Sequence, residues 1–343
     1  MTISVCVVGA GIIGLSTALQ ILQNNSNSKY EVTIVAEKFG RGTTSSAAGA
    51  ILEPYSVGNT PIHMQKRWFS KTLDWIAQLG NDNPGLIGIH QLQINYFFTD
   101  DKPDPYWKDW LPGFRKVTAI EKKIACRNSS VNGWCLSTFC IDTSKYMAWL
   151  TKRIEDFGGR FQEKKLTSLN QLSSYDIIVN CSGIGAYSLV PDPSVTPARG
   201  QVMRVKAPWL QHSCVYEDDK TISYIFPRQL FQSGIVVLGG TYQVGNWNTN
   251  IDKNDSKKIF ENCCKLIPSL KNAEIIEETV GLRPTRPSVR LEIERRNVDQ
   301  KEIKIIHNYG HGGAGITLHW GSAIDAYKLV KQLSSQGKLL SKL

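Results

Sequence analysis

The first fourteen residues constrain the fold of this chain more than any other part of its sequence. Residues 3–8 form a short apolar run that leads into a glycine motif of the form G-x-G-x-x-G. The motif consists of Gly9, Ala10, Gly11, Ile12, Ile13 and Gly14. Its first glycine makes a tight turn, its second lets a pyrophosphate approach the backbone, and its third lets helix and strand pack closely. We therefore predict a strand, a turn that binds a dinucleotide, and a helix.

The residues that follow complete a β-α-β unit. Residues 12–22 carry apolar side chains at helical spacing, and residues 31–36 are typical of a second buried strand. Parallel strands joined by a helix require a right-handed crossover. The free amide groups and positive dipole at the start of this helix favour bound phosphate.

Strand patterns of two kinds alternate along the rest of the chain. Residues 176–180 and 303–307 resemble buried parallel strands, whereas residues 86–98, 201–206 and 235–238 alternate in polarity as antiparallel strands do. Helical periodicity is found in residues 143–157 and 316–333. This distribution predicts an α/β nucleotide-binding domain built from separate pieces of chain, with an antiparallel-sheet domain inserted between them. The first domain is placed at residues 1–56, 140–195 and 283–343, and the second at residues 57–139 and 196–282.

The charge and the cysteines limit the class of protein. The net charge is +10, but the basic residues are scattered and no nucleic-acid-binding motif is present, so we expect anionic small ligands and no nucleic acid. No apolar stretch reaches the roughly 20 residues that span a membrane. None of the eight cysteines forms a CxxC pair, and no signal peptide is recognisable. We expect reduced thiols, an intracellular protein and no metal site.

The last three residues are Ser341, Lys342 and Leu343. At a C-terminus this tripeptide is a peroxisomal address that an import receptor reads. We therefore expect the protein in the peroxisomal matrix, a compartment that houses oxidases producing hydrogen peroxide.

Three features bear on the kind of dinucleotide. Glu37 ends the second predicted strand, where a carboxylate can hold ribose hydroxyls and would repel the 2′-phosphate of NADP; the alternative is a solvated glutamate at a strand end. Residues 41–49 are rich in hydroxyl groups, as a loop around a pyrophosphate would be. Residues 309–315 form a second glycine-rich entrance to a helix, whose dipole could stabilise a reduced flavin. A nicotinamide dehydrogenase has no need of that second entrance, so FAD is favoured over NAD.

Motifs spread along the whole chain resemble those of the D-amino-acid oxidase family, which contains D-amino-acid oxidases and D-aspartate oxidases. The residues that carry the resemblance are 8–16, 43–45, 47–49, 113–116, 179–183, 199–202, 207–209, 239–240, 281–287 and 307–313. The resemblance implies a Rossmann-type FAD-binding domain and an α+β substrate domain with a mostly antiparallel, twisted sheet. It also implies oxidation of a D-amino acid by hydride transfer to the flavin, with oxygen as the acceptor and a 2-oxo acid, ammonia and hydrogen peroxide as products.

The same resemblance assigns roles to individual residues. Arg283 would hold the substrate carboxylate as a bidentate fork, Tyr224 would add its hydroxyl, and the carbonyl of Gly313 would take the amine. Tyr55 would line the substrate pocket, and His311 is expected to pack in the glycine loop without acting as a base. Beyond the first glycine motif, the residues expected to bind FAD are Glu37, Lys38, Thr43, Thr44, Ser45, Ala48, Gly49, Ser182, Gly312, Gly315, Ile316 and Thr317.

Two substrate branches remain open. The aspartate branch uses extra cations for the side-chain carboxylate, but this chain has Tyr242 at one such position and the acidic residues 217–219 around the other, with Lys220 as a weaker substitute. Residues 60–63 and the short loop 216–222 nevertheless resemble the aspartate branch. We favour neutral D-amino acids, with D-aspartate and D-glutamate as the alternative. A glycine or sarcosine oxidase and a flavoprotein without catalysis are the rival classes, and the oligomeric state is undetermined, with a homodimer compatible.

Overall fold

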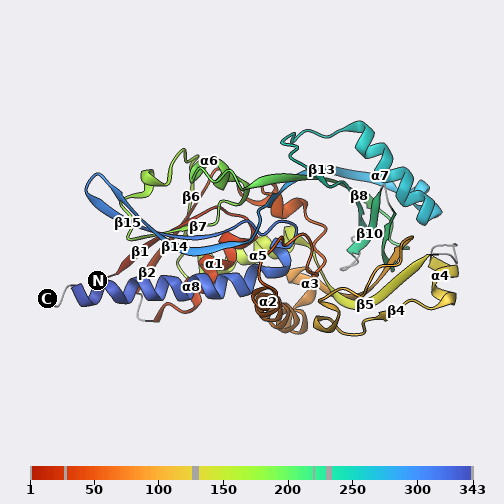
Figure 1. Ribbon diagram of the computed structural model, residues 1–343, viewed down its shortest axis with the longest axis horizontal. Coiled ribbons are helices and arrows are strands. Elements are labelled where there is room, and N and C mark those ends of the chain that lie inside the picture. The colour runs from red at the N-terminus through yellow and green to blue at the C-terminus, as the bar shows by residue number, and fades with distance from the viewer. Residues whose placement is uncertain (1, 27–28, 126–130, 219–220, 229–233, 341–343) are drawn as a thin grey trace.

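The computed structural model describes residues 2–26, 29–125, 131–218, 221–228 and 234–340, and its strands form two sheets (Figure 1). The six-stranded sheet occupies the left part of the view, with the long helix α8 below it, and the nine-stranded sheet occupies the right part. The two sheets correspond to the predicted fold class, a Rossmann-type domain and an α+β domain with a mostly antiparallel sheet.

The six-stranded sheet is parallel except at one edge. Strand β1 lies between β2 and β7, and it pairs with both in parallel. The outermost pair, β14 and β15, is antiparallel. In sheet order the strands are β14 (Arg290–Val298), β15 (Lys301–Tyr309), β7 (Ile177–Asn180), β1 (Ile3–Val8), β2 (Tyr30–Ala36) and β6 (Arg160–Glu163). The predicted strands at 3–8, 31–36, 176–180 and 303–307 are therefore confirmed as neighbours in one sheet.

The helices that cover this sheet pack on one another. α1 lies against α8 and α5, and α2 lies against α8. Asp142 stabilises the start of α5, because its carboxylate accepts a 3.0 Å hydrogen bond from the amide of Ser144. These helices are α1 (Ile12–Gln23), α2 (Ile62–Asp82), α5 (Thr143–Asp156) and α8 (Gly315–Leu340). Buried apolar side chains from sheet and helices form one continuous core.

The nine-stranded sheet is mostly antiparallel. Its single parallel pair joins β3 to β9. In sheet order the strands are β12 (Gln243–Val244), β8 (Thr196–Lys206), β11 (Ile235–Gly239), β10 (Ile222–Arg228), β9 (Ser213–Glu217), β3 (Ile89–Phe98), β5 (Asn132–Ile141) and β4 (Arg115–Lys116). Helix α7 (Lys253–Leu266) packs on β8, β10 and β11.

Strand β13 (Glu274–Thr285) links the two parts of the molecule. It pairs with β8 along its whole length and leads directly toward β14 of the other sheet (Figure 1). In this register Gly281 faces Gly200 and Arg283 faces Ala198. The end of β13 therefore carries Arg283 to the junction of the two sheets.

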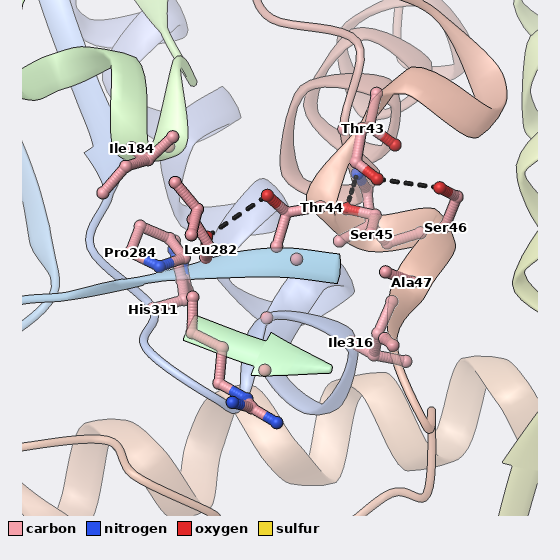
Figure 2. A pocket seen from close by; sticks show the side chains of 18 of the residues that line it. Thr43, Thr44, Ser45, Ser46, Ala47, Ile184, Leu282, Pro284, His311 and Ile316 are labelled. Atoms are coloured by element: carbon pink, nitrogen blue, oxygen red, sulfur yellow. Dashed lines mark hydrogen bonds between the residues drawn. The ribbon is translucent and has the colours of Figure 1, made fainter. Parts of the chain in front are cut away.

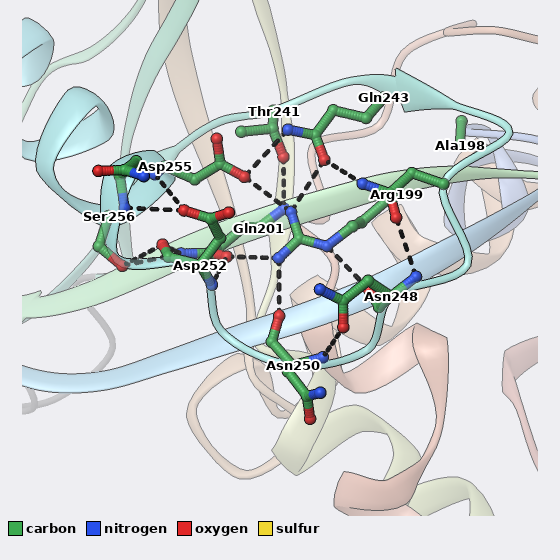
Figure 3. A network of polar contacts seen from close by, with 12 residues as sticks. Ala198, Arg199, Gln201, Thr241, Gln243, Asn248, Asn250, Asp252, Asp255 and Ser256 are labelled. Carbon is green, nitrogen blue, oxygen red and sulfur yellow. Dashed lines mark hydrogen bonds and ion pairs between the residues drawn. The ribbon is translucent and has the colours of Figure 1, made fainter.

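A buried polar network fixes the loop between β12 and α7 beside β8 (Figure 3). Its centre is Arg199, a fully buried guanidinium that pairs with Asp255 at 2.8 Å. The other oxygens that accept from Arg199 belong to Gln201, Gln243, Asn248 and Asn250. Because the buried charge is paired and its donors are satisfied, the network holds β8 and the neighbouring loop in one arrangement.

The shorter elements lie in the connections. The short helices are α3 (Pro84–Ile87), α4 (Ala119–Ala125) and α6 (Ala186–Leu189). Turns of 3-10 helix occupy Gly40–Gly42, Thr44–Ala47, Lys108–Trp110, Leu169–Leu172, Gly183–Gly185 and Pro268–Asn272. The strand expected from residue 86 begins only at Ile89, because Pro84 starts the one-turn helix α3 and Gly88 ends it with φ 82°.

Three further findings concern the cysteines, the length and polarity of the helices, and the predicted residues that lie outside the described ranges. Seven cysteines are buried thiols that form no disulfide within the described ranges, and the eighth, Cys126, lies outside those ranges. Over the described ranges, none of the helices is both long and apolar enough to cross a membrane. The tripeptide 341–343 also lies outside the described residues, as does Lys220.

Candidate cofactor and substrate site

One cavity of about 870 Å³ brings together most of the residues that the sequence predicts for the site. Figure 2 shows part of its lining: residues of the 43–47 turn lie on the right with Ile316 below them, and Leu282, Pro284 and His311 lie on the left. The predicted residues that line it are Gly9, Ala10, Gly11, Ile12, Ile13, Glu37, Lys38, Thr43, Thr44, Ser45, Ala48, Gly49, Tyr55, Ser182, Tyr224, Arg283, Gly312, Gly313, Gly315 and Ile316. Gly14, Thr317 and Tyr242 do not line it.

The three glycines of the first motif have different structural roles. A Cβ at Gly14 would lie 1.9 Å from the carbonyl oxygen of Gly9, and one at Gly9 would lie 2.5 Å from that of Cys181. These two glycines therefore let α1, β1 and the end of β7 pack closely. Gly11 differs, because a Cβ there would meet only the hydroxyl of Ser45, at 3.2 Å. Its open side faces the cavity, where the backbone at the start of α1 is accessible.

The 41–49 loop is tied to the other elements around the cavity. Ser45 accepts a 2.9 Å hydrogen bond from the amide of Ile12 at the start of α1. Thr44 donates a 3.2 Å hydrogen bond to the carbonyl of Leu282 on β13 (Figure 2). The loop therefore connects the first helix with the strand that carries Arg283.

Cations gather near the end of β2. Lys38, Arg41 and Lys164 line the cavity there. Glu37 lines the same region, and its carboxylate pairs with Lys165 at 3.0 Å. The cations and the exposed start of α1 are complementary to a phosphate-containing ligand, and Glu37 is an acceptor for hydroxyl groups.

The second glycine-rich loop leads into α8 on the opposite side of the cavity. Gly312 adopts φ 54°, and a Cβ there would lie 2.0 Å from the carbonyl oxygen of Ser56. By contrast, a Cβ at Gly315 would meet only Ile12, at 4.0 Å, so the first turn of α8 faces open space. Two helix starts, those of α1 and α8, therefore border one cavity.

Arg283 and Tyr224 lie together at the junction of the two sheets. The guanidinium of Arg283 donates a 3.1 Å hydrogen bond to the carbonyl of Thr241. Burial raises the pKa of the Tyr224 hydroxyl, and the positive charge of Arg283 opposes that rise. Tyr224 also stacks on Phe226, with ring centroids 4.7 Å apart. A cation and a protonated hydroxyl thus face the cavity side by side, as the binding of a carboxylate requires.

Tyr55 and Tyr242 border Arg283 from the other side. Burial raises the pKa of Tyr55 to about 12 against the opposing charge of Arg283. The ring of Tyr242 lies edge-on to Tyr55, with centroids 6.0 Å apart, and 5.6 Å from the guanidinium of Arg283. Its hydroxyl shares a 2.7 Å hydrogen bond with Ser56. Tyr242 is 40% exposed, so it covers Arg283 from the solvent side.

Two further residues that the sequence singled out, Thr317 and His311, have structural surroundings that indicate their roles. The hydroxyl of Thr317 donates to the carbonyl of Glu53 at 2.8 Å and accepts from its amide at 3.2 Å, which fixes the segment that leads to Tyr55. His311 is 2% exposed, and burial lowers its pKa to about 3. A neutral imidazole with so low a pKa is a poor general base at neutral pH.

Sequence reasoning did not single out Glu53 and Tyr96 as site residues, although both line the cavity. Tyr96 of β3 donates its hydroxyl to the carboxylate of Glu53. Burial raises the pKa of Glu53 to about 7. Glu53 stands two residues before Tyr55, but nothing in the local pattern shows that its side chain turns toward the cavity.

The two-sheet architecture, the two helix starts and the adjacent Arg283 and Tyr224 fit an FAD-dependent oxidoreductase, and comparison with known proteins agrees. The family described as "FAD dependent oxidoreductase" matches residues 4–327. A D-aspartate oxidase from Homo sapiens is 40% identical and covers 96% of this chain and 95% of its own length. A D-amino acid oxidase from Dugesia ryukyuensis is 34% identical, and the match covers 98% of this chain and 99% of that protein. The chain belongs to the family of D-amino-acid oxidases and D-aspartate oxidases.

Solved structures support the fold. A glycine oxidase from Geobacillus kaustophilus superimposes with a TM-score of 0.77 over 98% of this chain and 95% of that one, at 18% identity. A glycine oxidase from Bacillus cereus gives a TM-score of 0.75 over 96% and 97%, at 17% identity. At these identities the likeness concerns the architecture alone.

The cavity fits the FAD on which this family depends. Five buried polar atoms of residues that line it have no hydrogen-bond partner within the described part of the chain: Ser182 Oγ, Glu278 Oε1, Thr279 Oγ1, Asn308 Oδ1 and His311 Nε2. Buried polar groups are seldom left unpaired, so their presence around one cavity indicates a polar ligand. Together with the open sides of Gly11 and Gly315, they provide donors and acceptors along the path between the two helix starts.

Proposed function

We propose that this chain oxidises D-amino acids with oxygen to 2-oxo acids, ammonia and hydrogen peroxide, and that it favours neutral substrates. The observation that carries the proposal is the placement of Arg283, Tyr224 and Tyr55 on the cavity that also receives both helix starts. Bound there, FAD supplies the two-electron acceptor for the reaction. The chain's own task is then to bind, orient and shield the substrate.

Arg283 is the carboxylate-binding residue of this proposal. Its guanidinium offers parallel donors to both oxygens, and the hydroxyl of Tyr224 adds a third donor. The carbonyl of Gly313, which also lines the cavity, is placed to accept from the amine. With carboxylate and amine both held, a single hydrogen on Cα can point at the ring of the cofactor, which accounts for selection of one enantiomer.

The preference for neutral substrates over acidic ones rests on charge. Among the described residues around Tyr55 and Tyr224, Arg283 is the cation that lines the cavity, and Tyr242 stands where the aspartate branch has a cation. The side-chain carboxylate of an acidic substrate would therefore enter a region that offers no described cation to it and that contains Glu53. Burying this charge without a partner carries a substantial desolvation cost.

The second candidate is a D-aspartate oxidase, favoured by the 40% identity to the human protein of that name. A peroxide assay on the purified, FAD-loaded protein with D-Ala, D-Pro, D-Asp and D-Glu separates the two. The proposal expects higher kcat/KM for D-Ala and D-Pro, and D-Asp as the best substrate would establish the alternative. Equal turnover of L-enantiomers, or no peroxide with any D-amino acid, would refute both.

The proposed location is the peroxisomal matrix. The support is the sequence Ser341-Lys342-Leu343, together with the production of peroxide in the proposed reaction. A fluorescent protein fused to the N-terminus of the chain should colocalise with a peroxisomal marker, and the same fusion without residues 341–343 should not. Diffuse fluorescence of the intact fusion would contradict the proposal.

A further inference from the structure

Glu53 is an acidic side chain of the substrate region whose role the proposed reaction leaves open. Its backbone is fixed on both sides by the hydroxyl of Thr317. Its carboxylate accepts the hydroxyl of Tyr96, and part of its surface faces the cavity. The side chain is therefore held in place by two different elements, α8 and β3, and is available to a ligand.

The negative charge of Glu53 has no paired cation, in contrast to that of a neighbouring acid. A second acid, Glu217 of β9, lines the same cavity, but it pairs with Lys102 at 2.8 Å. No ion pair is found for Glu53 within the described ranges. A partly buried carboxylate without a cation is costly, and the cost falls when a cation arrives with the ligand.

Tyr55 lines the same cavity as the two charged groups Arg283 and Glu53. Its hydroxyl interacts electrostatically with Arg283, which lowers its pKa, and with Glu53, which raises it. Arg283 comes from the end of β13, whereas Glu53 comes from the segment that precedes Tyr55. A substrate whose carboxylate is held by Arg283 thus shares its cavity with a negative side chain from a different segment of the chain.

Resting on the proposed function, we propose that Glu53 is a specificity-determining residue that receives the cationic side-chain end of a D-amino acid, a guanidinium or an ammonium group. The tyrosine rings of the cavity provide apolar and π surfaces for the methylene groups of such a side chain and for its charged end. An acidic side chain would meet repulsion from the same carboxylate. Glu53 therefore extends the favoured substrates from neutral to basic D-amino acids and excludes acidic ones.

The experiment compares D-arginine with D-citrulline, which has nearly the same shape but no charge. The ratio of their kcat/KM values isolates the side-chain charge from every step that the two substrates share. In the holoenzyme the ratio should lie well above one, and in Glu53→Gln it should fall about 10- to 100-fold, as for a lost hydrogen bond to a charged group. Glu53→Gln keeps an oxygen that can accept from Tyr96, and bound FAD and thermal stability report whether the variant folds.

Glu217→Gln is the matched control, since it removes another carboxylate that lines the cavity. Its ratio should stay within about threefold of the wild-type ratio, because the charge of Glu217 is already paired. A wild-type ratio near one, an unchanged ratio in Glu53→Gln, or an equal loss with both substrates would overturn the inference. In each of these cases turnover of D-Ala still leaves the proposed function standing, whereas absence of turnover with every D-amino acid removes the proposed function itself.

Discussion

Gly200 of β8 lies directly against the guanidinium of Arg283 on the neighbouring strand β13. A Cβ at Gly200 would lie 2.4 Å from Nη1 of Arg283 and 2.6 Å from its Cζ. This glycine therefore clears the space in which the guanidinium lies flat over the sheet. The position of the guanidinium that we propose to bind the substrate carboxylate depends on the absence of a side chain from the strand beside it.

Gly200→Ala should impair catalysis more than stability. The atoms that meet the new Cβ belong to the end of a flexible side chain, so Arg283 can move aside without disrupting the sheet. A guanidinium displaced by about 1 Å should lower kcat/KM for D-Ala by about 100-fold. The measurement is steady-state kinetics together with the melting temperature. Gly80→Ala on α2, whose new Cβ would lie 3.4 Å from Ile89, is the control and should keep wild-type kinetics.

Arg283→Ala should nearly abolish turnover while FAD stays bound. The lost pairing with the substrate carboxylate is worth about 3–5 kcal/mol, which corresponds to about 150- to 5,000-fold in kcat/KM. Arg283→Lys retains a charge but not the fork of donors, so its activity should be intermediate. The flavin absorption spectrum of both variants should match that of the wild type. Unchanged kinetics in Arg283→Ala would remove this residue from the substrate site.

Gly315→Leu should weaken FAD binding without destabilising the protein that lacks FAD. A Cβ at this position faces open space beside Ile12, and leucine is a better helix former than glycine at the start of α8. Overpacking a filled site costs about 1–3 kcal/mol, which predicts about 5- to 150-fold weaker binding. Fluorescence titration with FAD measures the effect, and Gly315→Ala should show a smaller one. Equal affinity of the leucine variant would place the cofactor away from the start of α8.

Selectivity for a basic substrate should depend on pH. The carboxyl of Glu53, with its pKa raised by burial to about 7, is neutral below that pH and charged above it. Its carboxyl accepts from Tyr96 of β3 and interacts with Tyr55 beside it, and the other titratable groups on this part of the cavity are Tyr224 of β10, Arg283 of β13 and Glu217 of β9, which pairs with Lys102. Burial raises the pKa of Tyr96, Tyr55 and Tyr224 above the usual tyrosine value, so none of them titrates near pH 7.

The kcat/KM ratio of D-arginine to D-citrulline should therefore rise between about pH 6 and pH 8 in the wild type. The ratio cancels the titration of the substrate amine, and kcat/KM reports the free enzyme. In Glu53→Gln the ratio should be flat over the same range. A flat wild-type profile would show that the charge of Glu53 does not reach the substrate.

The local parts of the site were predictable from sequence, and the parts set by distant contacts were not. The turn at Gly9–Gly14 follows from steric rules that act within six residues, so β1, α1 and β2 could be predicted from the sequence nearly to their ends. Arg283 and Tyr224 were found through family motifs. The direction of Glu53, by contrast, depends on Thr317, which is 264 positions away in the chain, and on Tyr96. No local pattern encodes such a contact.

Two helices were also missed, although the sequence carries their signals. In α2 the buried residues Gln65, Trp68, Thr72, Ile76 and Leu79 follow at spacings of three and four after Pro61, and Phe69 is buried beside Trp68. In α7 the carboxylate of Asp252 caps the amides of Asn254 and Asp255 at 2.8 and 3.2 Å. The high polarity of both segments hides the apolar stripe that packs on α8 and on the nine-stranded sheet.

Stability should fall steeply as the pH drops from about 6.5 to about 4, because three buried histidines resist protonation. Burial lowers the pKa of His307 and His319 to about 4 and that of His311 to about 3. In the unfolded chain each titrates near 6.5, so between these values the unfolded state binds up to three more protons than the folded state. The stabilisation is complete above pH 6.5 and is lost on acidification, at up to about 4 kcal/mol per pH unit.

Urea unfolding at saturating FAD between pH 7.5 and pH 4.5 measures this slope. His319→Gln should reduce it by about one third. A stability that stays constant over this range would mean that the folded protein already carries these protons.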